Sequence, residues 1–324
     1  AAIAPFLLDL DLRIGEILLY WPVTLLIAAA GILAAAGIAR YADYRTVVDA
    51  ASKRDDPLLN LGQAIAEAQK TSVRTKESDY AVSDKQIRAA DQKTGYAYLN
   101  ALFFARHRSL VFRPVCKRLA IIGGLALIGL GFGFVSSAEQ AAFLLSHFNK
   151  VIPFLILVMS FMTVGEHLCR AMYYHCDNSL LRYSFYRNAA SRHFRLRLAR
   201  ITGLNVLIGA ALSAALTIVY MAAGGVPGPE LGLLWLSVLS LAVFFSVHHL
   251  AMYYLFQPYT TDLFAKNPFF HLVTFAVSGA SGACIVIQPP IAPFTLIVFA
   301  AAIIYLAAAL TLVSRCGHRT FRVK

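Results

Sequence analysis

Long apolar stretches alternate with polar and basic stretches along this chain of 324 residues. A helix needs about 20 mainly apolar residues to cross the hydrocarbon core of a bilayer. The stretches of this kind are Ile17–Ala39, Leu119–Val135, Val151–Cys169, Ile201–Ala223, Leu231–Phe256, Phe269–Ile287 and Ile291–Val313. The pattern predicts an all-α, polytopic transmembrane helical bundle with about seven spans.

Composition supports this fold class. The chain is 59% hydrophobic and only 14% charged, whereas a soluble domain carries about a quarter charged residues. A soluble globular protein is therefore excluded, and the polar stretches are read as links between spans.

The basic residues lie mainly on one side of the predicted membrane. Residues 40–118 hold 15 Lys and Arg, residues 170–200 hold seven and residues 314–324 hold four, with Lys266 in a short link. The other side holds only Arg13 and Lys150. By the positive-inside rule the basic links and the C-terminus are cytoplasmic. The net charge of +12 then reflects topology and contact with anionic membrane lipids, and we expect no nucleic-acid partner.

Three parts are predicted from this organisation. Residues 1–39 form an N-terminal segment with the first span, residues 40–118 form a basic cytoplasmic helical segment, and residues 119–324 form a six-span domain. Within residues 40–118 the stretch Leu58–Val73 has the spacing of an amphipathic helix. No glycine-rich phosphate loop or Walker-type lysine is present there. We therefore do not expect the chain to hydrolyse ATP by the P-loop route.

Aromatic and basic residues are interleaved just before the second predicted span, a combination that favours a helix lying along the membrane surface. We expect Pro114 to end this helix and turn the chain into the span. A membrane anchor and a specific docking function both fit the composition. The anchor residues are Tyr96, Tyr98, Phe103, Phe104, Arg106, His107 and Arg108.

Ionisable residues inside a membrane are costly and mark candidate functional positions. The topology places five of them at similar depth near the cytoplasmic side: Glu166, His167, His248, His249 and His271. Three interpretations remain open: mutual hydrogen bonding with no further role, the polar wall of a substrate pathway, and a metal or haem site. Against the last, the flanking histidines of the His-box membrane enzymes are missing, and Cys169, His175 and Cys176 lack a CxxC partner set.

We expect no metal or cofactor in this chain. The five cysteines also predict no structural disulfide, because none of them falls in an outside loop.

Two segments together resemble the membrane subunits of a bacterial ABC exporter family of the ABC-2-like type. In one, Gly165–Asp177 leads into Ser179-Leu180-Leu181-Arg182-Tyr183-Ser184-Phe185-Tyr186-Arg187, which is similar to a "CDxSLLxYxFYR"-like link between two spans. In the other, Gly95–Arg108 is similar to that family's segment before a span. The two segments cover about a fifth of the chain, in the expected order.

The resemblance implies a permease subunit that pairs with an ABC ATP-binding subunit, which binds the ATP and Mg²⁺, and with a second or related permease. The link at residues 170–200 then acts as a coupling segment. The residues assigned to coupling are Asp177, Ser179, Leu180, Leu181, Arg182, Tyr183, Phe185, Tyr186 and Arg187.

Physical requirements agree with such a contact, because aromatic residues and arginines are enriched at interface hot spots. Asp177 or Ser179 is expected to cap a short helix starting at Leu180. Glu166 lies about three turns upstream, so movement of the link could reach it. The alternative is that residues 176–200 form only a basic loop on lipid.

The expected function is export of a peptide, lipid-like or hydrophobic substrate out of a bacterial cytoplasm across the plasma membrane, without catalysis by this chain. Two alternatives remain. One is a haem- or metal-binding membrane enzyme that uses the His layer, and the other is a structural subunit of a larger membrane complex.

Overall fold

The structure, a computed structural model, describes residues 91–135, 138–259 and 268–322, together with 28–33, 36–37 and the single positions 25 and 71. The chain divides into two compact units, Ala1–Ala64 and Ile65–Lys324. The helices below belong to the second unit. Of the predicted first span, residues 28–33 are helical. The predicted helix Leu58–Val73 lies outside the described residues except for position 71.

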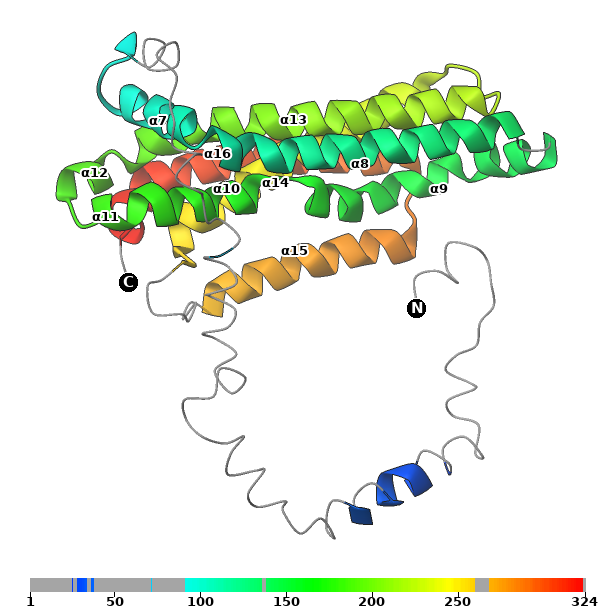
Figure 1. The fold of residues 1–324 in the computed structure, drawn as a ribbon, viewed down its shortest axis with the longest axis horizontal. Helices are drawn as coiled ribbons and strands as arrows, with labels where there is room; N and C mark the ends of the chain where they lie inside the picture. The colour runs from blue at the N-terminus through cyan, green and yellow to red at the C-terminus, as the bar shows by residue number, and fades with distance from the viewer. Residues whose placement is uncertain are drawn as a thin grey trace. The chain divides into compact units, whose positions relative to one another are not determined.

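Long helices make up most of the second unit, and its described residues contain no strand (Figure 1). In chain order the elements are α7 (Gly95–Arg106), α8 (Arg108–Val135), α9 (Ala138–Met162), α10 (Gly165–Met172), a π-helical turn η2 (Tyr173–Asp177), α11 (Asn178–Leu180), α12 (Ser184–Asn188), α13 (Ala190–Ala222), α14 (Pro229–Phe256), α15 (Pro268–Ile287) and α16 (Ile291–Thr320).

Five of the described helical segments are long and apolar enough to cross a membrane: Arg108–Gly133, Ala138–Leu180, Ala190–Ala222, Pro229–Phe256 and Ile291–Thr320. Leu272–Ile287, within α15, is apolar but shorter. Large apolar side chains on these helices are exposed, as expected for lipid-facing positions; Leu127 on α8 is 71% exposed and Ile304 on α16 is 68% exposed. The predicted fold class is confirmed as a helical, multi-pass membrane protein, but the described residues provide five candidate spans and do not confirm the predicted seven.

Helix α14 lies at the centre and packs against α13, α16, α9 and α10. Fifteen of its 28 residues are buried, which explains why its sequence is apolar all round instead of on one face. Small residues let neighbouring backbones approach. A Cβ at Gly133 of α8 would lie 3.3 Å from Ala222 of α13, and one at Gly209 would lie 3.4 Å from Ala242 of α14.

The described helices have one basic end and one weakly charged end. At the basic end Arg197 of α13 contacts Asn100 of α7 and Tyr254 of α14, and Thr320 of α16 bonds to the Tyr254 carbonyl. Figure 1 shows α7, α11 and α12 gathered at this end. At the opposite end of the described helices Lys150 is the only Lys or Arg. The predicted charge asymmetry therefore corresponds to two ends of the helices.

Three boundaries predicted from hydropathy are corrected. Pro114 does not turn the chain, because α8 runs through it from Arg108 and the break falls at His107. A helical proline leaves the carbonyl four residues earlier without a donor. That carbonyl belongs to Leu110. The predicted polar residue His167 lies in α10, and its Nε2 is buried without a hydrogen-bond partner among the described residues.

The third predicted span, Val151–Cys169, is not one helix: α9 ends at Met162 and α10 begins at Gly165. The fourth begins at Ala190, well before the predicted Ile201. At 33 residues, α13 is about 50 Å long, against about 30 Å for the hydrocarbon core. Its arginine-rich first third therefore continues beyond the apolar stretch. Hydropathy finds where a helix is apolar, not where it begins.

Candidate functional site

A buried ion pair lies at the basic end. Asp177 is the last residue of the π-helical turn, in which the Asn178 amide donates to the Tyr173 carbonyl five residues earlier. Arg197 lies on the buried face of α13. The two side chains meet through both guanidinium nitrogens, with Nη1 2.6 Å from Oδ2 and Nη2 2.7 Å from Oδ1. Their side chains are 0% and 1% exposed.

Every donor of Arg197 is used. Nη1 also donates to the Tyr254 hydroxyl at 3.0 Å, Nη2 to the Tyr186 hydroxyl at 3.0 Å, and Nε to Asn100 Oδ1 at 2.9 Å. Together with the two bonds to Asp177, these satisfy the five N–H groups of a guanidinium. We call Asp177, Arg197, Asn100, Tyr186, Tyr253 and Tyr254 the buried network.

Both carboxylate oxygens of Asp177 also accept two hydrogen bonds each. Oδ1 accepts from Arg197 and, at 2.6 Å, from the Tyr186 hydroxyl, and Oδ2 accepts from Arg197 and from the Tyr253 hydroxyl. Burial raises the pKa of Tyr186 far above its ordinary value, so the hydroxyl keeps the proton that it donates. A buried charge is tolerated only when it is paired and hydrogen-bonded in this way.

The buried network joins helices that are far apart in the sequence. Asn100 Nδ2 donates to the Tyr96 carbonyl of α7 at 2.8 Å and lies 2.9 Å from Nδ1 of His193 in α13. Phe321, just after α16, stacks on the Tyr254 ring with centroids 4.2 Å apart. The network thus fixes α7, η2, α12, α13 and α14 to one another, with the end of α16 packed beside it.

A short exposed segment lies directly beside the buried network. Tyr183 and Phe185 are 56% and 57% exposed, their ring centroids are 5.7 Å apart, and Arg182 is exposed next to them. We call Arg182–Arg187 the aromatic segment. Leu181, just before this segment, and Tyr186 within it are buried. The Tyr96 hydroxyl of α7 also donates a hydrogen bond to the Phe185 carbonyl at 3.1 Å.

The structure separates the predicted coupling residues into two groups. Arg182, Tyr183 and Phe185 are exposed, with Arg187 partly exposed. Asp177, Leu181 and Tyr186 are buried and do not present their side chains to a partner. The predicted cap is also wrong, because Asp177 makes no capping bond and Ser179 donates to the Cys176 carbonyl at 3.0 Å. Leu180 ends α11 and is half-buried.

The break between α9 and α10 is supported by neighbouring helices. The Val164 amide donates to Asn205 Oδ1 of α13 at 2.8 Å, and Asn205 Nδ2 donates to the Ser246 hydroxyl of α14 at 2.8 Å. Arg118 of α8 donates to the Thr163 carbonyl at 3.2 Å. Backbone that is irregular at membrane depth persists only where the protein satisfies it.

The residues of the predicted polar layer do not form one cluster in the structure. Glu166 is not buried; its side chain is 60% exposed and pairs with Arg170 at 2.7 Å. His249 lies against the start of α10, where a Cβ on Gly165 would come within 2.9 Å of its Nδ1. His248 faces α16 and lies 3.1 Å from the Tyr305 hydroxyl. The side chain of His271 lies outside the described residues.

The predicted anchor residues form α7 and the start of α8. Phe103 and Phe104 are buried, Tyr96 and Tyr98 are half-buried, and Arg106 and Arg108 are exposed. His107, between the two helices, is buried, and its ring centroid lies 4.9 Å from that of His175 in η2. Burial, with His175 and Arg106 close by, lowers the pKa of His107 to about 4.

Within the described ranges, no group of three His, Cys, Asp or Glu side chains has the arrangement needed to hold a metal ion. All five cysteines are free, at positions 116, 169, 176, 284 and 316.

Arg197 and Asn205 were not predicted as site residues, although the sequence contains a signal for both. The buried face of α13 runs through Phe194, Ile201 and Ile208 at helical spacing, and both polar residues fall on that same face. A charged or amide side chain on an apolar helical face predicts a buried partner. No comparable signal marks Asn100 or Tyr253. The chain has no match among family models, curated proteins or solved structures.

Proposed function

We propose that the chain is the transmembrane subunit of an ABC-type exporter in a bacterial plasma membrane, with the basic end and the C-terminus in the cytoplasm. In this proposal a separate ATP-binding subunit supplies ATP hydrolysis, and a second or related permease completes the pathway. The main support is the aromatic segment, in which the exposed rings of Tyr183 and Phe185 lie between Arg182 and Arg187 and the buried network fixes the backbone.

Adjacent exposed apolar side chains that are rimmed by polar residues are typical of interaction sites. Tyr183 and Phe185 lie at the basic end, where Tyr, Phe and Arg together favour contact with a protein surface. The adjoining buried network holds the segment in place, so a partner meets a preformed surface and loses little conformational entropy on binding.

A mechanical route leads from this surface into the membrane domain. Helix α10, the π-helical turn and α11 follow one another without a gap from Gly165 to Leu180. The N-terminal end of this helical stretch is the break at Thr163–Val164, where the Val164 amide donates to Asn205 of α13. In the proposed mechanism, movement of the aromatic segment by the ATP-binding subunit turns this helical stretch about the break. The peptide, lipid-like or hydrophobic substrate then moves along helices that contact α10.

The test places a photo-crosslinking amino acid at position 183 or 185 in the tagged full chain in its native membrane. We expect crosslinks to a protein with Walker motifs. A probe at Phe143, an aromatic residue that is 55% exposed at the opposite end, serves as the control and should give none.

The matching variant is Tyr183→Ala with Phe185→Ala, compared with Phe132→Ala with Phe143→Ala. Loss of two interface anchors should lower recovery of the ATP-binding subunit by about tenfold or more, while the control pair leaves it unchanged. Crosslinks only to structural membrane proteins, or undiminished ATPase recovery, would contradict the proposal and favour a subunit of another complex.

A further inference from the structure

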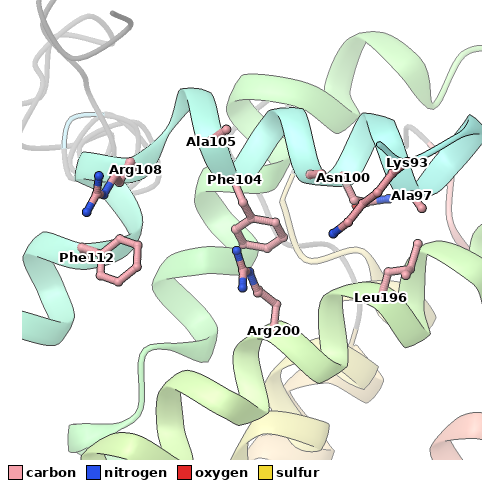
Figure 2. A pocket seen from close by; sticks show the side chains of 10 residues that line it. Lys93, Ala97, Asn100, Phe104, Ala105, Arg108, Phe112, Leu196 and Arg200 are labelled. Carbon is pink, nitrogen blue, oxygen red and sulfur yellow. The ribbon is translucent and has the colours of Figure 1, made fainter. Parts of the chain in front are cut away.

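A cavity of about 560 Å³ lies between α7, the first turns of α8 and the arginine-rich part of α13. Figure 2 shows Phe104 of α7 above Arg200 of α13, with Arg108 and Phe112 of α8 to one side and Lys93 and Leu196 to the other. Its size falls within the range of small-molecule sites.

The cavity carries three cationic side chains and no carboxylate in its lining. Arg108 lies over the Phe112 ring at 5.4 Å, and Arg200 over the Phe104 ring at 5.8 Å. Within the described part of the chain, the ion pairs involve other residues, Arg170 with Glu166 and Arg197 with Asp177. Lys93, Arg108 and Arg200 therefore provide positive charge that no described carboxylate neutralises.

Apolar surface lies beside these cations. Phe112 is 43% exposed and Leu196 is 40% exposed. The apolar part of α8 begins at Leu119, about 10 Å along the helix from Phe112 at 1.5 Å per residue. The apolar part of α13 begins at Ile201, directly after Arg200. The cavity thus lies where the charged ends of two candidate spans become apolar, which is the depth of lipid headgroups.

We propose that this cavity binds the phosphate headgroup of an anionic phospholipid. Arg200, at the middle of the lining, binds the phosphate, because a guanidinium group can donate two parallel hydrogen bonds to phosphate oxygens. Arg108 and Lys93, on either side of it, add positive charge. Phe112 and Leu196 contact the glycerol and the first methylenes of an acyl chain. Binding of the lipid at this cavity requires no ATP-binding partner.

Binding there also has a structural effect. Asn100 forms part of the cavity wall and accepts the hydrogen bond from Arg197 Nε in the buried network. A bound headgroup bridges α7, α8 and α13, so it stabilises the arrangement in which that bond forms.

The test uses native mass spectrometry of the purified full chain in a neutral detergent, with phosphatidylglycerol or phosphatidylcholine added. We expect one phosphatidylglycerol molecule to remain bound where phosphatidylcholine is lost, and the melting temperature to rise only with the former. Arg108→Gln with Arg200→Gln should weaken phosphatidylglycerol binding about thirtyfold.

The matched control is Arg192→Gln with Arg195→Gln, two exposed arginines of α13 that do not line the cavity; it should change binding less than threefold. If the first pair fails to fold, Phe112→Glu places a repelling carboxylate in the cavity and should give the same loss. Equal losses in both arginine pairs, or equal binding of the two lipids, would overturn the proposal. Stabilisation by inorganic phosphate to the same extent as by phosphatidylglycerol would assign the site to a soluble phosphate and also overturn it.

Discussion

Tyr183 and Tyr186 lie three residues apart, yet the first is 56% exposed and the second 1% exposed. Tyr183 belongs to the exposed surface of the aromatic segment, and Tyr186 donates to Asp177 within the buried network. The same residue type therefore serves two purposes in one link. The buried network gives the segment a fixed position, and the exposed rings give it a surface that another molecule can contact.

The largest expected effect comes from breaking the ion pair. Arg197→Met should destabilise the protein by about 3–5 kcal/mol, because Asp177 is left charged and buried without its partner. Thermal unfolding in detergent and the yield of folded protein measure the loss.

The matched variant is Arg197→Met with Asp177→Leu, which removes both charges. It should recover part of the lost stability, since an apolar pair avoids an unpaired charge. If the double variant lost as much stability as Arg197→Met and Asp177→Leu lose in sum, the two residues would not act as a unit.

Tyr186→Phe tests the buried side of the comparison with a smaller change. It removes a hydroxyl that donates to Asp177 and accepts from Arg197, and we expect a loss of about 1–3 kcal/mol. Tyr183→Phe removes an exposed hydroxyl and should change stability by less than about 0.5 kcal/mol. Chemical denaturation of the two variants side by side measures both values, and equal losses would refute the distinction.

A pH dependence of stability is expected at His107. The folded-state pKa is about 4, below the usual value of about 6.5. The neutral ring is therefore favoured by folding, so its contribution to stability is present above pH 6.5 and is lost as the pH falls towards 4. These two pKa values correspond to a loss of at most about 2 kcal/mol at pH 5.

His107→Phe keeps a ring against Phe103 and His175 and removes the titration. The measurement is unfolding between pH 5 and pH 7.5, taken as the difference between the unmodified protein and the variant, which cancels the other histidines. If both proteins lost the same stability between pH 7.5 and pH 5, groups other than His107 would be responsible for the acid sensitivity.

Much of the fold was predictable because apolar length alone identifies helices that cross a membrane. The predicted starts of α8 and α13 were late for one reason. Arg108–Arg118 and Arg192–Arg200 lower the mean hydropathy, yet their backbones continue the helices. The break at Thr163–Val164 was not predictable, because it depends on Asn205 and Arg118 from other helices.

The candidate site was found in part. Tyr183 and Phe185 were assigned to coupling by the family resemblance, supported by their aromatic character, and both rings are exposed in the structure. The assignment of Asp177 as a helix cap followed its sequence preference and overlooked Arg197, 20 residues later. Pairing over that distance depends on how the chain returns through α12 into α13, which local patterns do not encode.

The π-helical turn at Tyr173–Asp177 has a consequence for insertions and deletions. Each residue of an α-helix advances the side-chain direction by about 100°. The wider π-helical turn has more residues per turn, so it shifts the direction of the side chains that follow it, starting at Asn178. If these five residues adopted ordinary α-helical geometry, Asp177 would point away from Arg197 and the rings of the aromatic segment would face another direction. The link therefore tolerates substitutions on its surface far better than any change in its length upstream of Asp177.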